Sequence, residues 1–180
     1  MSEPRWLTAE EQQVWRSYQA ASAMLRAHLE GQLQHESGMP PSYYEVLVSL
    51  SEANGRRMRM SELASVLDSS RSRLSHAVSR LEAKGWVRRE SCPTDKRGSW
   101  AVLTDSGFSA LAEAAPGHVE AVREALFDQL TPEQVRQLGE ISEAIANGMR
   151  PRCQAVREAA DAADEAAELV SPVAATATSG

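Results

Sequence analysis

The sequence predicts a mainly α-helical fold with a small β-hairpin, arranged as a winged helix-turn-helix domain between long helices at the two ends of the chain. Apolar residues recur every three to four positions near both ends, which is typical of amphipathic helices. The middle of the chain holds two short helical patterns joined by a tight turn, followed by two runs of alternating apolar residues. With 180 residues, the chain is long enough for one such domain plus extensions.

The first helix is predicted to run from a capping box formed by Thr8 and Glu11 to about residue 35. Its apolar stripe consists of Val14, Tyr18, Ala21, Leu25, His28 or Leu29, and Leu33. The sequence "SGMPP" then interrupts the helical pattern, and Ser42 with Glu45 predicts a second capping box. Gly55 is a natural stop for this second helix.

The helix-turn-helix is predicted over residues 61–85. Ser61 is expected to cap the helix "ELASVLD", and Ser70 to cap the helix "RSRLSHAVSRLEAKG". The spacing of the apolar residues in the second helix fixes its buried face, which comprises Leu74, Ala77, Val78 and Leu81. The opposite face then presents Ser72, Arg73, Ser75, His76, Ser79 and Arg80. Short hydroxyls, an imidazole and guanidinium groups suit the reading of base edges and phosphates.

A hairpin is predicted directly after this helix. The runs "WVRRE" and "SWAVL" alternate as strands, with Trp86, Val102 and Val87 as inward-facing candidates. Pro93, Asp95 and Gly98 are turn-forming residues. A hairpin in this position forms a wing beside the recognition helix.

Two helical segments are expected after the wing. Thr104 caps the first, in which Pro116 predicts a kink, and Thr131 with Pro132 begins the second. Four regions follow from these patterns: a long N-terminal helix (1–38), the winged helix-turn-helix domain (39–104), further long helices (105–150) and an Ala/Glu-rich tail (151–180). The Ala/Glu portion of the tail could hold a helix, but its apolar groups are mostly alanine, so the tail is expected to be disordered toward its end.

The charge distribution favours nucleic acid as the partner. The net charge is −6, but residues 56–97 carry eleven Lys and Arg against five Asp and Glu. This basic centre in an acidic body matches a phosphate-binding surface, although a solvated arginine-rich face is the simpler alternative. No apolar run is long enough to span a membrane, and the N-terminal residues lack the pattern of a secretory signal. Two cysteines, Cys92 and Cys153, are too few for a disulfide framework, so we expect a cytoplasmic protein.

These residues resemble the MarR family of bacterial winged-helix transcription regulators over roughly positions 8–148. The resemblance rests on "MSELASVLDSSRSRLSHAVSRLEAKGWVRR", on "DKRG" at the wing tip and on "VLTDSG" at the start of the next helix. It implies an obligate homodimer in which residues 1–38 and 105–150 form the dimerisation helices and residues 39–104 bind a palindromic operator in double-stranded DNA. Many members of the family release DNA on binding a small aromatic or anionic effector, and others respond to oxidants.

The resemblance also implies roles for individual residues. The DNA-binding set comprises Ser61, Ser70, Arg71, Ser72, Arg73, Ser75, His76, Arg80, Asp95, Lys96 and Arg97. Arg97 matches the wing-tip arginine that enters the minor groove, and Asp95 matches the carboxylate that orients it. A single extended arginine suits this narrow, negatively charged groove. The alternatives are an ordinary turn-forming role for Asp95 and a solvated tip for Lys96 and Arg97.

Aromatic residues in the first two helices are candidates for an effector site. The set comprises Trp15, Arg16, Tyr18, His28, Tyr43 and Tyr44, and it could instead fill a dimer core. His28 and His35 lie two turns apart on one helix, but two ligands are too few for a metal site. Cys92 lies near Arg88 and Arg89, which favour a reactive thiolate, yet a structural cysteine remains the alternative.

The scattered histidines, carboxylates and hydroxyls form no catalytic constellation, so the chain is not expected to be an enzyme or to need a cofactor. We expect a homodimeric DNA-binding regulator, a repressor released by an effector. A constitutive DNA binder without effector and a winged-helix protein-interaction module are the alternatives.

Overall fold

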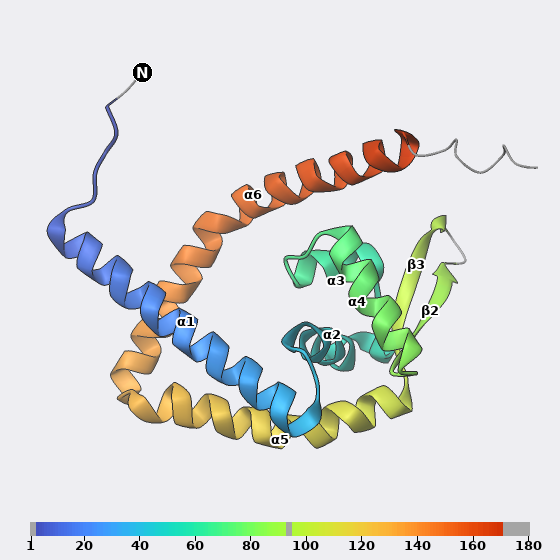
Figure 1. Cartoon of the computed structure of the whole chain (residues 1–180), viewed down its shortest axis with the longest axis horizontal. Coiled ribbons are helices and arrows are strands. Elements are labelled where there is room, and N and C mark those ends of the chain that lie inside the picture. Colours follow the sequence, from blue (N-terminus) through green and yellow to red (C-terminus); the bar gives the residue numbers. More distant parts are fainter. Residues whose placement is uncertain (1–2, 93–94, 171–180) are drawn as a thin grey trace, which may run out of the picture.

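The computed structural model describes residues 3–92 and 95–170, without the side chains of residues 92–98, 157, 161 and 163–170. The long helix α1 (Ala9–Ser37) leads into a compact domain of α2 (Pro41–Glu52), α3 (Met60–Val66), α4 (Arg71–Ala83) and a small sheet. Two further long helices, α5 (Asp105–Ala125) and α6 (Pro132–Val170), follow the sheet. Short 3₁₀ turns, η1 (Asn54–Arg56) and η2 (Phe127–Gln129), complete the chain (Figure 1). The expected mainly helical class is confirmed.

The sheet is antiparallel and has three strands in the order β1-β3-β2. Strands β2 (Val87–Cys92) and β3 (Asp95–Leu103) form the expected hairpin, with Val87 opposite Leu103 and Glu90 opposite Trp100. Strand β1 (Arg57–Arg59), which the sequence did not predict, pairs with the other edge of β3. The first strand of the hairpin begins at Val87 rather than at Trp86, whose side chain packs against the edge of the core.

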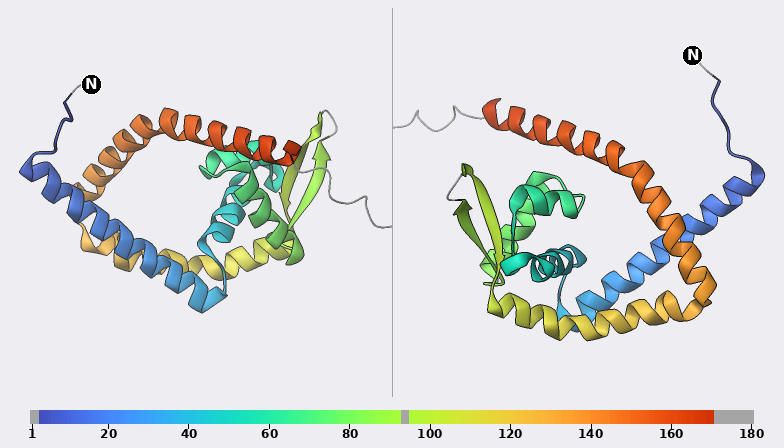
Figure 2. Two further views of the ribbon diagram at one scale, coloured as in Figure 1. Left: turned by 45° about the horizontal axis from the view of Figure 1, so that its top comes forward. Right: turned by 180° about the vertical axis from the view of Figure 1, so that it is seen from behind.

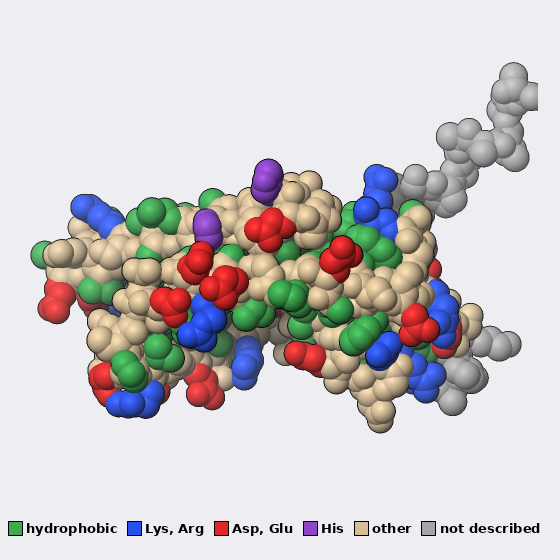
Figure 3. Space-filling view, turned by 90° about the horizontal axis from the view of Figure 1, so that it is seen from below, with side chains coloured by type: hydrophobic (Ala, Val, Ile, Leu, Met, Phe, Trp, Pro, Cys, Tyr) green, Lys and Arg blue, Asp and Glu red, His purple; other side chains and the backbone are tan. Residues whose placement is uncertain are grey.

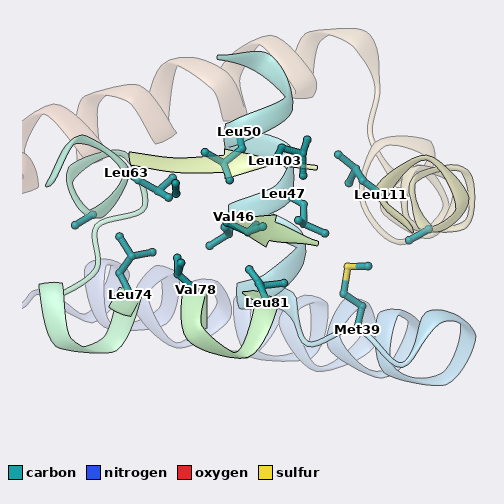
Figure 4. Packing of buried hydrophobic residues seen from close by; sticks show 14 residues of the cluster. Met39, Val46, Leu47, Leu50, Leu63, Leu74, Val78, Leu81, Leu103 and Leu111 are labelled. Atoms are coloured by element: carbon teal, nitrogen blue, oxygen red, sulfur yellow. The ribbon is translucent and has the colours of Figure 1, made fainter. Parts of the chain in front are cut away.

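The core lies between α2, α3, α4 and one face of the sheet (Figure 4). Leu47 and Leu50 from α2, Leu63 from α3 and Val78 and Leu81 from α4 are fully buried. Leu74 is also buried, whereas Ala77 is half-buried, so the predicted inward face of α4 is confirmed for its three larger side chains. The opposite face of α4 is consequently turned outward.

Most of the predicted helix starts agree with the structure. The Thr8–Glu11 capping box is present, Ser70 accepts a hydrogen bond from the Arg73 amide, and Thr104 accepts one from the Gly107 amide. Thr131 caps α6 by accepting from the amide of Gln134.

Two predicted caps are wrong. Helix α2 begins at Pro41, so Ser42 lies inside its first turn, because proline with its fixed φ is already suited to the first helical position. Helix α3 begins at Met60, with Arg59 at the cap position and Ser61 in the first turn.

Helix α6 does not end near residue 150. It continues through Pro151 to Val170, so a helix covers much of the segment expected to be an Ala/Glu-rich tail. Figures 1 and 2 show that its distal half changes direction and passes over α3 and α4 toward the wing. Helix α5 likewise runs through Pro116 as one element.

Candidate nucleic-acid interface

The turn between α3 and α4 fixes the position of the exposed face of α4. Asp68 adopts the left-handed conformation with a φ of 49°, which aspartate tolerates better than most residues. The amide of Ser69 donates to the carbonyl of Ala64 at 2.9 Å, and the amide of Asp68 donates to that of Ser65 at 3.3 Å. These two bonds form a Schellman motif that ends α3 and directs the chain into α4. Ser70 then caps α4 by accepting a hydrogen bond from the Arg73 amide.

The exposed face of α4 carries the polar set expected from its spacing. Arg71, Ser72, Arg73, His76, Ser79 and Arg80 are all exposed. Arg73, His76 and Arg80 line a groove of about 430 Å³ between α4 and α2, together with Tyr43 and Glu45 of α2. Three side chains that can donate hydrogen bonds therefore lie along one outward surface.

Ser75 has a different environment from its neighbours. It is half-buried because Arg89 of β2 lies against it. The Arg89 guanidinium donates to the Ser75 carbonyl at 2.8 Å, to the Ser75 hydroxyl at 3.1 Å and to the Ser79 hydroxyl at 3.2 Å. The Arg89 backbone amide donates to the Glu82 carboxylate at 3.0 Å. Arg89 therefore joins the wing to α4.

Sequence reasoning missed this role of Arg89, although the strand alternation carried the signal. Val87 faces the core, and Arg89 two residues later points to the same side of β2. The outer face of the sheet holds another group that was missed: the guanidinium groups of Arg57 and Arg59 lie over the Trp100 ring, at 5.0 and 5.5 Å from its centroid. Strand β1 is only three residues long, which is too short for a periodicity signal.

The remaining DNA-binding candidates are divided between the helix starts and the wing. Ser61 is exposed in the first turn of α3, and Ser70 is half-buried at the start of α4. Strand β3 includes Asp95, Lys96 and Arg97, but their side chains lie outside the described part of the chain. The same holds for the thiol of Cys92.

The structure divides the aromatic candidates for an effector site. Trp15 and Tyr18 stack on each other on α1, with ring centroids 6.2 Å apart, and both are about half exposed. Figures 1 and 2 show the N-terminal half of α1 projecting away from α2, which carries Tyr43 and Tyr44. Arg16 and His28 are exposed on α1.

Tyr43 and Tyr44 also have different surroundings from each other. Tyr43 lines the groove beside α4, whereas the Tyr44 ring contacts that of His118 with centroids 4.5 Å apart. Burial raises the pKa of Tyr44 and lowers that of His118. His118 also lies within hydrogen-bonding distance of Gln32, so α1, α2 and α5 meet at this point.

Within residues 3–92 and 95–170, no group of three or more His, Cys, Asp and Glu side chains could hold a metal ion. None of the helices in the described part of the chain is both long enough and apolar enough to cross a membrane.

Comparison with known proteins identifies the family. The profile of the MarR family matches residues 37–98, which hold α2, the helix-turn-helix and most of the wing. Sco3205 from Streptomyces coelicolor is a MarR family transcriptional regulator whose crystal structure was solved in complex with DNA. Its sequence is 60% identical to this chain, and the two structures align with a TM-score of 0.79. The similarity covers 81% of this chain and 92% of that protein. The chain belongs to the MarR family.

Two further relatives are also transcriptional regulators. AbsC, a MarR family regulator from Streptomyces coelicolor, is 43% identical with a TM-score of 0.79, over 82% of this chain and 99% of that protein. The transcriptional repressor MprA of Escherichia coli is 27% identical over 105 residues, which are 58% of this chain and 59% of that repressor. The MarR family consists of transcriptional regulators rather than enzymes, so the expectation of a non-enzymatic regulator is confirmed.

Proposed function

We propose that this MarR family regulator binds a palindromic operator in double-stranded DNA as a homodimer, with α4 of each subunit in the major groove. The observation that carries the proposal is the outward face of α4, where Arg73, His76 and Arg80 are exposed opposite three buried aliphatic side chains. A rigid helix with donors on its free side suits the major groove, where Arg reads guanine and phosphates fix the register. The relative Sco3205, solved in complex with DNA, supports the same partner.

The start of α4 adds a phosphate site to this surface. Ser70 caps the helix, and Arg71 is exposed in its first turn. Helix N-termini attract phosphates because their free amides and the helix dipole both favour negative charge. Ser61, in the first turn of α3, is likewise assigned to the DNA phosphates.

The wing supplies the second contact. Arg97 is assigned to the minor groove, with Asp95 restraining it and Lys96 on a neighbouring phosphate. An arginine at a hairpin tip can follow the narrow groove without base-specific geometry. This assignment rests on the family resemblance of "DKRG" and on the position of these residues in β3.

Exposed apolar residues on the long helices support a homodimer. Val14 and Trp15 on α1 are 63% and 50% exposed, and Ile141 on α6 is 56% exposed. Figure 3 shows further apolar side chains at the surface on the side of α5. Such faces mark protein interfaces, and a second copy would cover them. On this division, residues 39–104 read DNA, while α1, α5 and the first part of α6 form the dimer.

Repression with release by an aromatic or anionic effector is the regulatory part of the proposal. The relative MprA, a transcriptional repressor of Escherichia coli, supports repression. The groove beside α4 supports an effector, because Tyr43 offers a ring and Arg73 a cation within one cavity. Thermal-shift screening with aromatic acids, scored together with operator release, tests this part. No response across a broad panel would favour a constitutive DNA binder.

The DNA-binding proposal is tested by comparing the parent protein with Arg73→Ala and His76→Ala on the DNA upstream of the chain's own gene. Each variant should weaken binding by about 1–3 kcal/mol, as expected for a base-reading contact. Arg136→Ala is the control, since Arg136 is an exposed arginine on α6 that pairs with Glu133. Binding by the parent should fall steeply with salt. If all three variants and the parent show equally weak, salt-insensitive retention, a protein-interaction module is the better description.

A further inference from the structure

The distal half of α6 lies on the surface assigned above to DNA. The segment 149–160 (the covering segment) passes α3 and the start of α4, as the two orientations in Figure 2 show. Helix α6 contacts α4 directly. This arrangement gives α4 an intramolecular neighbour on its N-terminal end.

Three cavities lie between α6 and the helix-turn-helix. Each is lined on one side by the helix-turn-helix and on the other by α6. A cavity of about 320 Å³ lies between Ser70 and Arg73 on one side and Cys153 and Val156 on the other. A second, of about 210 Å³, lies between Ser61 and Arg71 and the α6 residue Glu158. A third, of about 510 Å³, lies between Val66 of α3 and residues of α6 that include Cys153.

Four of the residues in these cavities belong to the proposed DNA-binding set. They are Ser61, Ser70, Arg71 and Arg73. A duplex that reaches the start of α4 would need the same space. Helix α6 in this position and DNA on this face therefore exclude each other.

The covering segment combines charges of both signs. It carries Arg150, Arg152 and Arg157 beside Glu158, and residues 161–168 add four acidic side chains. Glu158 lines the same cavity as Arg71, which is part of the proposed DNA-binding set. The opposite charges of Glu158 and Arg71 favour the covered arrangement, and salt weakens this attraction just as it weakens phosphate contacts.

The packing is loose enough to be reversed. Val156 is 70% exposed and Met149 is 45% exposed, although both line the cavity beside Arg73. Only part of each apolar side chain is therefore removed from water, and the unfilled cavities forfeit dispersion contacts. Cys153 is half-buried between the two parts. Such a contact can be displaced by a ligand as highly charged as DNA.

We propose that the covering segment occupies the N-terminal end of the DNA-reading face of its own chain and competes with the operator for it. The inference rests on the proposed function, because it assigns a competitor to the same surface. Operator affinity is then reduced by the fraction of molecules that are covered. If nine molecules in ten are covered, the apparent affinity is about tenfold weaker than the intrinsic one.

A matched pair of charge substitutions tests the competition. Cys153→Lys places a cation in the cavity that Arg73 and Arg152 also line, so repulsion should open the covering segment and tighten operator binding by about tenfold. Ala155→Lys adds the same charge two residues along, which is on the opposite side of the helix. It should leave affinity at the parental value or slightly raise it. Equal effects of the two substitutions would overturn the proposal.

Thiol reactivity gives a second readout that does not depend on the stability of a charge variant. In a Cys92→Ser background, Cys153 is the remaining thiol. Its reaction rate with 5,5′-dithiobis(2-nitrobenzoate) should rise when operator DNA is saturating, because DNA displaces the covering segment. An unchanged or slower rate with operator bound would overturn this inference alone. Failure of the parent and every variant to bind DNA would instead overturn the proposed function and the inference with it.

A reversible cross-link tests whether the segment covers its own chain. In the Cys92→Ser background, Val66→Cys places a thiol in the cavity that Cys153 also lines. A short bis(methanethiosulfonate) reagent should give a cross-link that runs as a single chain on a denaturing gel and abolishes operator binding. Reduction should restore binding. A cross-linked dimer band, which would place the segment on a second copy, contradicts the proposal.

Discussion

Arg89 of the wing donates hydrogen bonds to both the carbonyl and the hydroxyl of Ser75 in the middle of α4, at 2.8 and 3.1 Å. A strand residue thus holds a helix whose adjacent side is fixed by aliphatic packing. The orientation of α4 is therefore set from two directions: by the core through Leu74, Val78 and Leu81, and by the wing through Arg89.

Removing this link should loosen α4 relative to the wing. Arg89→Met keeps the aliphatic stem but loses the bonds to Ser75 and Ser79, and we expect it to lower the free energy of unfolding by about 1 kcal/mol. Arg88→Met is the matched control, since Arg88 bonds Glu90 on its own strand. Urea denaturation compares the two variants. A larger loss for Arg88→Met than for Arg89→Met would contradict the assigned role.

Gly107 is required where α5 begins. A Cβ at this position would lie 2.1 Å from the backbone carbonyl oxygen of Trp86, which also accepts a hydrogen bond from the Thr104 amide. Because the obstacle is backbone, it cannot rotate away, and Gly107→Ala should destabilise the fold by about 1–3 kcal/mol or more. Gly139→Ala in α6, with open space around its Cβ, should instead stabilise it by up to about 1 kcal/mol. Thermal denaturation distinguishes the two signs.

Protonation of His118 should weaken the junction of α1, α2 and α5. Burial lowers the pKa of His118, so the folded state binds this proton less readily than the unfolded state does. The resulting contribution to stability is fully present above the ordinary histidine value of about 6.5 and is lost as the pH falls below it. His118→Gln should flatten the dependence of stability on pH in this range. Parallel curves for the parent and the variant would contradict this assignment.

Arg97 is the residue of the wing on which operator binding should depend most. Arg97→Ala should weaken binding by about 1–3 kcal/mol if the side chain fills the minor groove. Arg123→Ala, on α5, is the control for the loss of one positive charge. Titration of both variants against labelled operator measures the difference. An operator affinity unchanged by Arg97→Ala would remove the wing from the interface.

The sequence predicted the features that depend on local chemistry. Leu74, Val78 and Leu81 recur at helical spacing, so the buried face of α4 followed from periodicity alone. Thr8 and Thr104 are caps that a short-range pattern identifies, and Ser61 failed as a cap because the helix starts one residue before it.

The features that were missed depend on contacts between distant segments. Strand β1 exists because β3 offers it an edge, and no pattern within three residues can reveal this. Arg89 reaches Ser75 fourteen residues back along the chain. The aromatic candidates Trp15 and Tyr43 lie on α1 and α2, which diverge. The Tyr44 ring contacts His118 rather than His28. Composition shows which groups are present, but only the fold decides which of them meet.

Methylation protection of guanine N7 on the operator tests the central assignment most directly, because this atom lies in the major groove. With the parent protein, we predict two protected patches about one helical turn apart, roughly 34 Å, with protection lost in Arg73→Ala. Protection of adenine N3 in the minor groove without protection of guanine N7, or a pattern that Arg73→Ala leaves unchanged, would contradict the placement of α4 in the major groove.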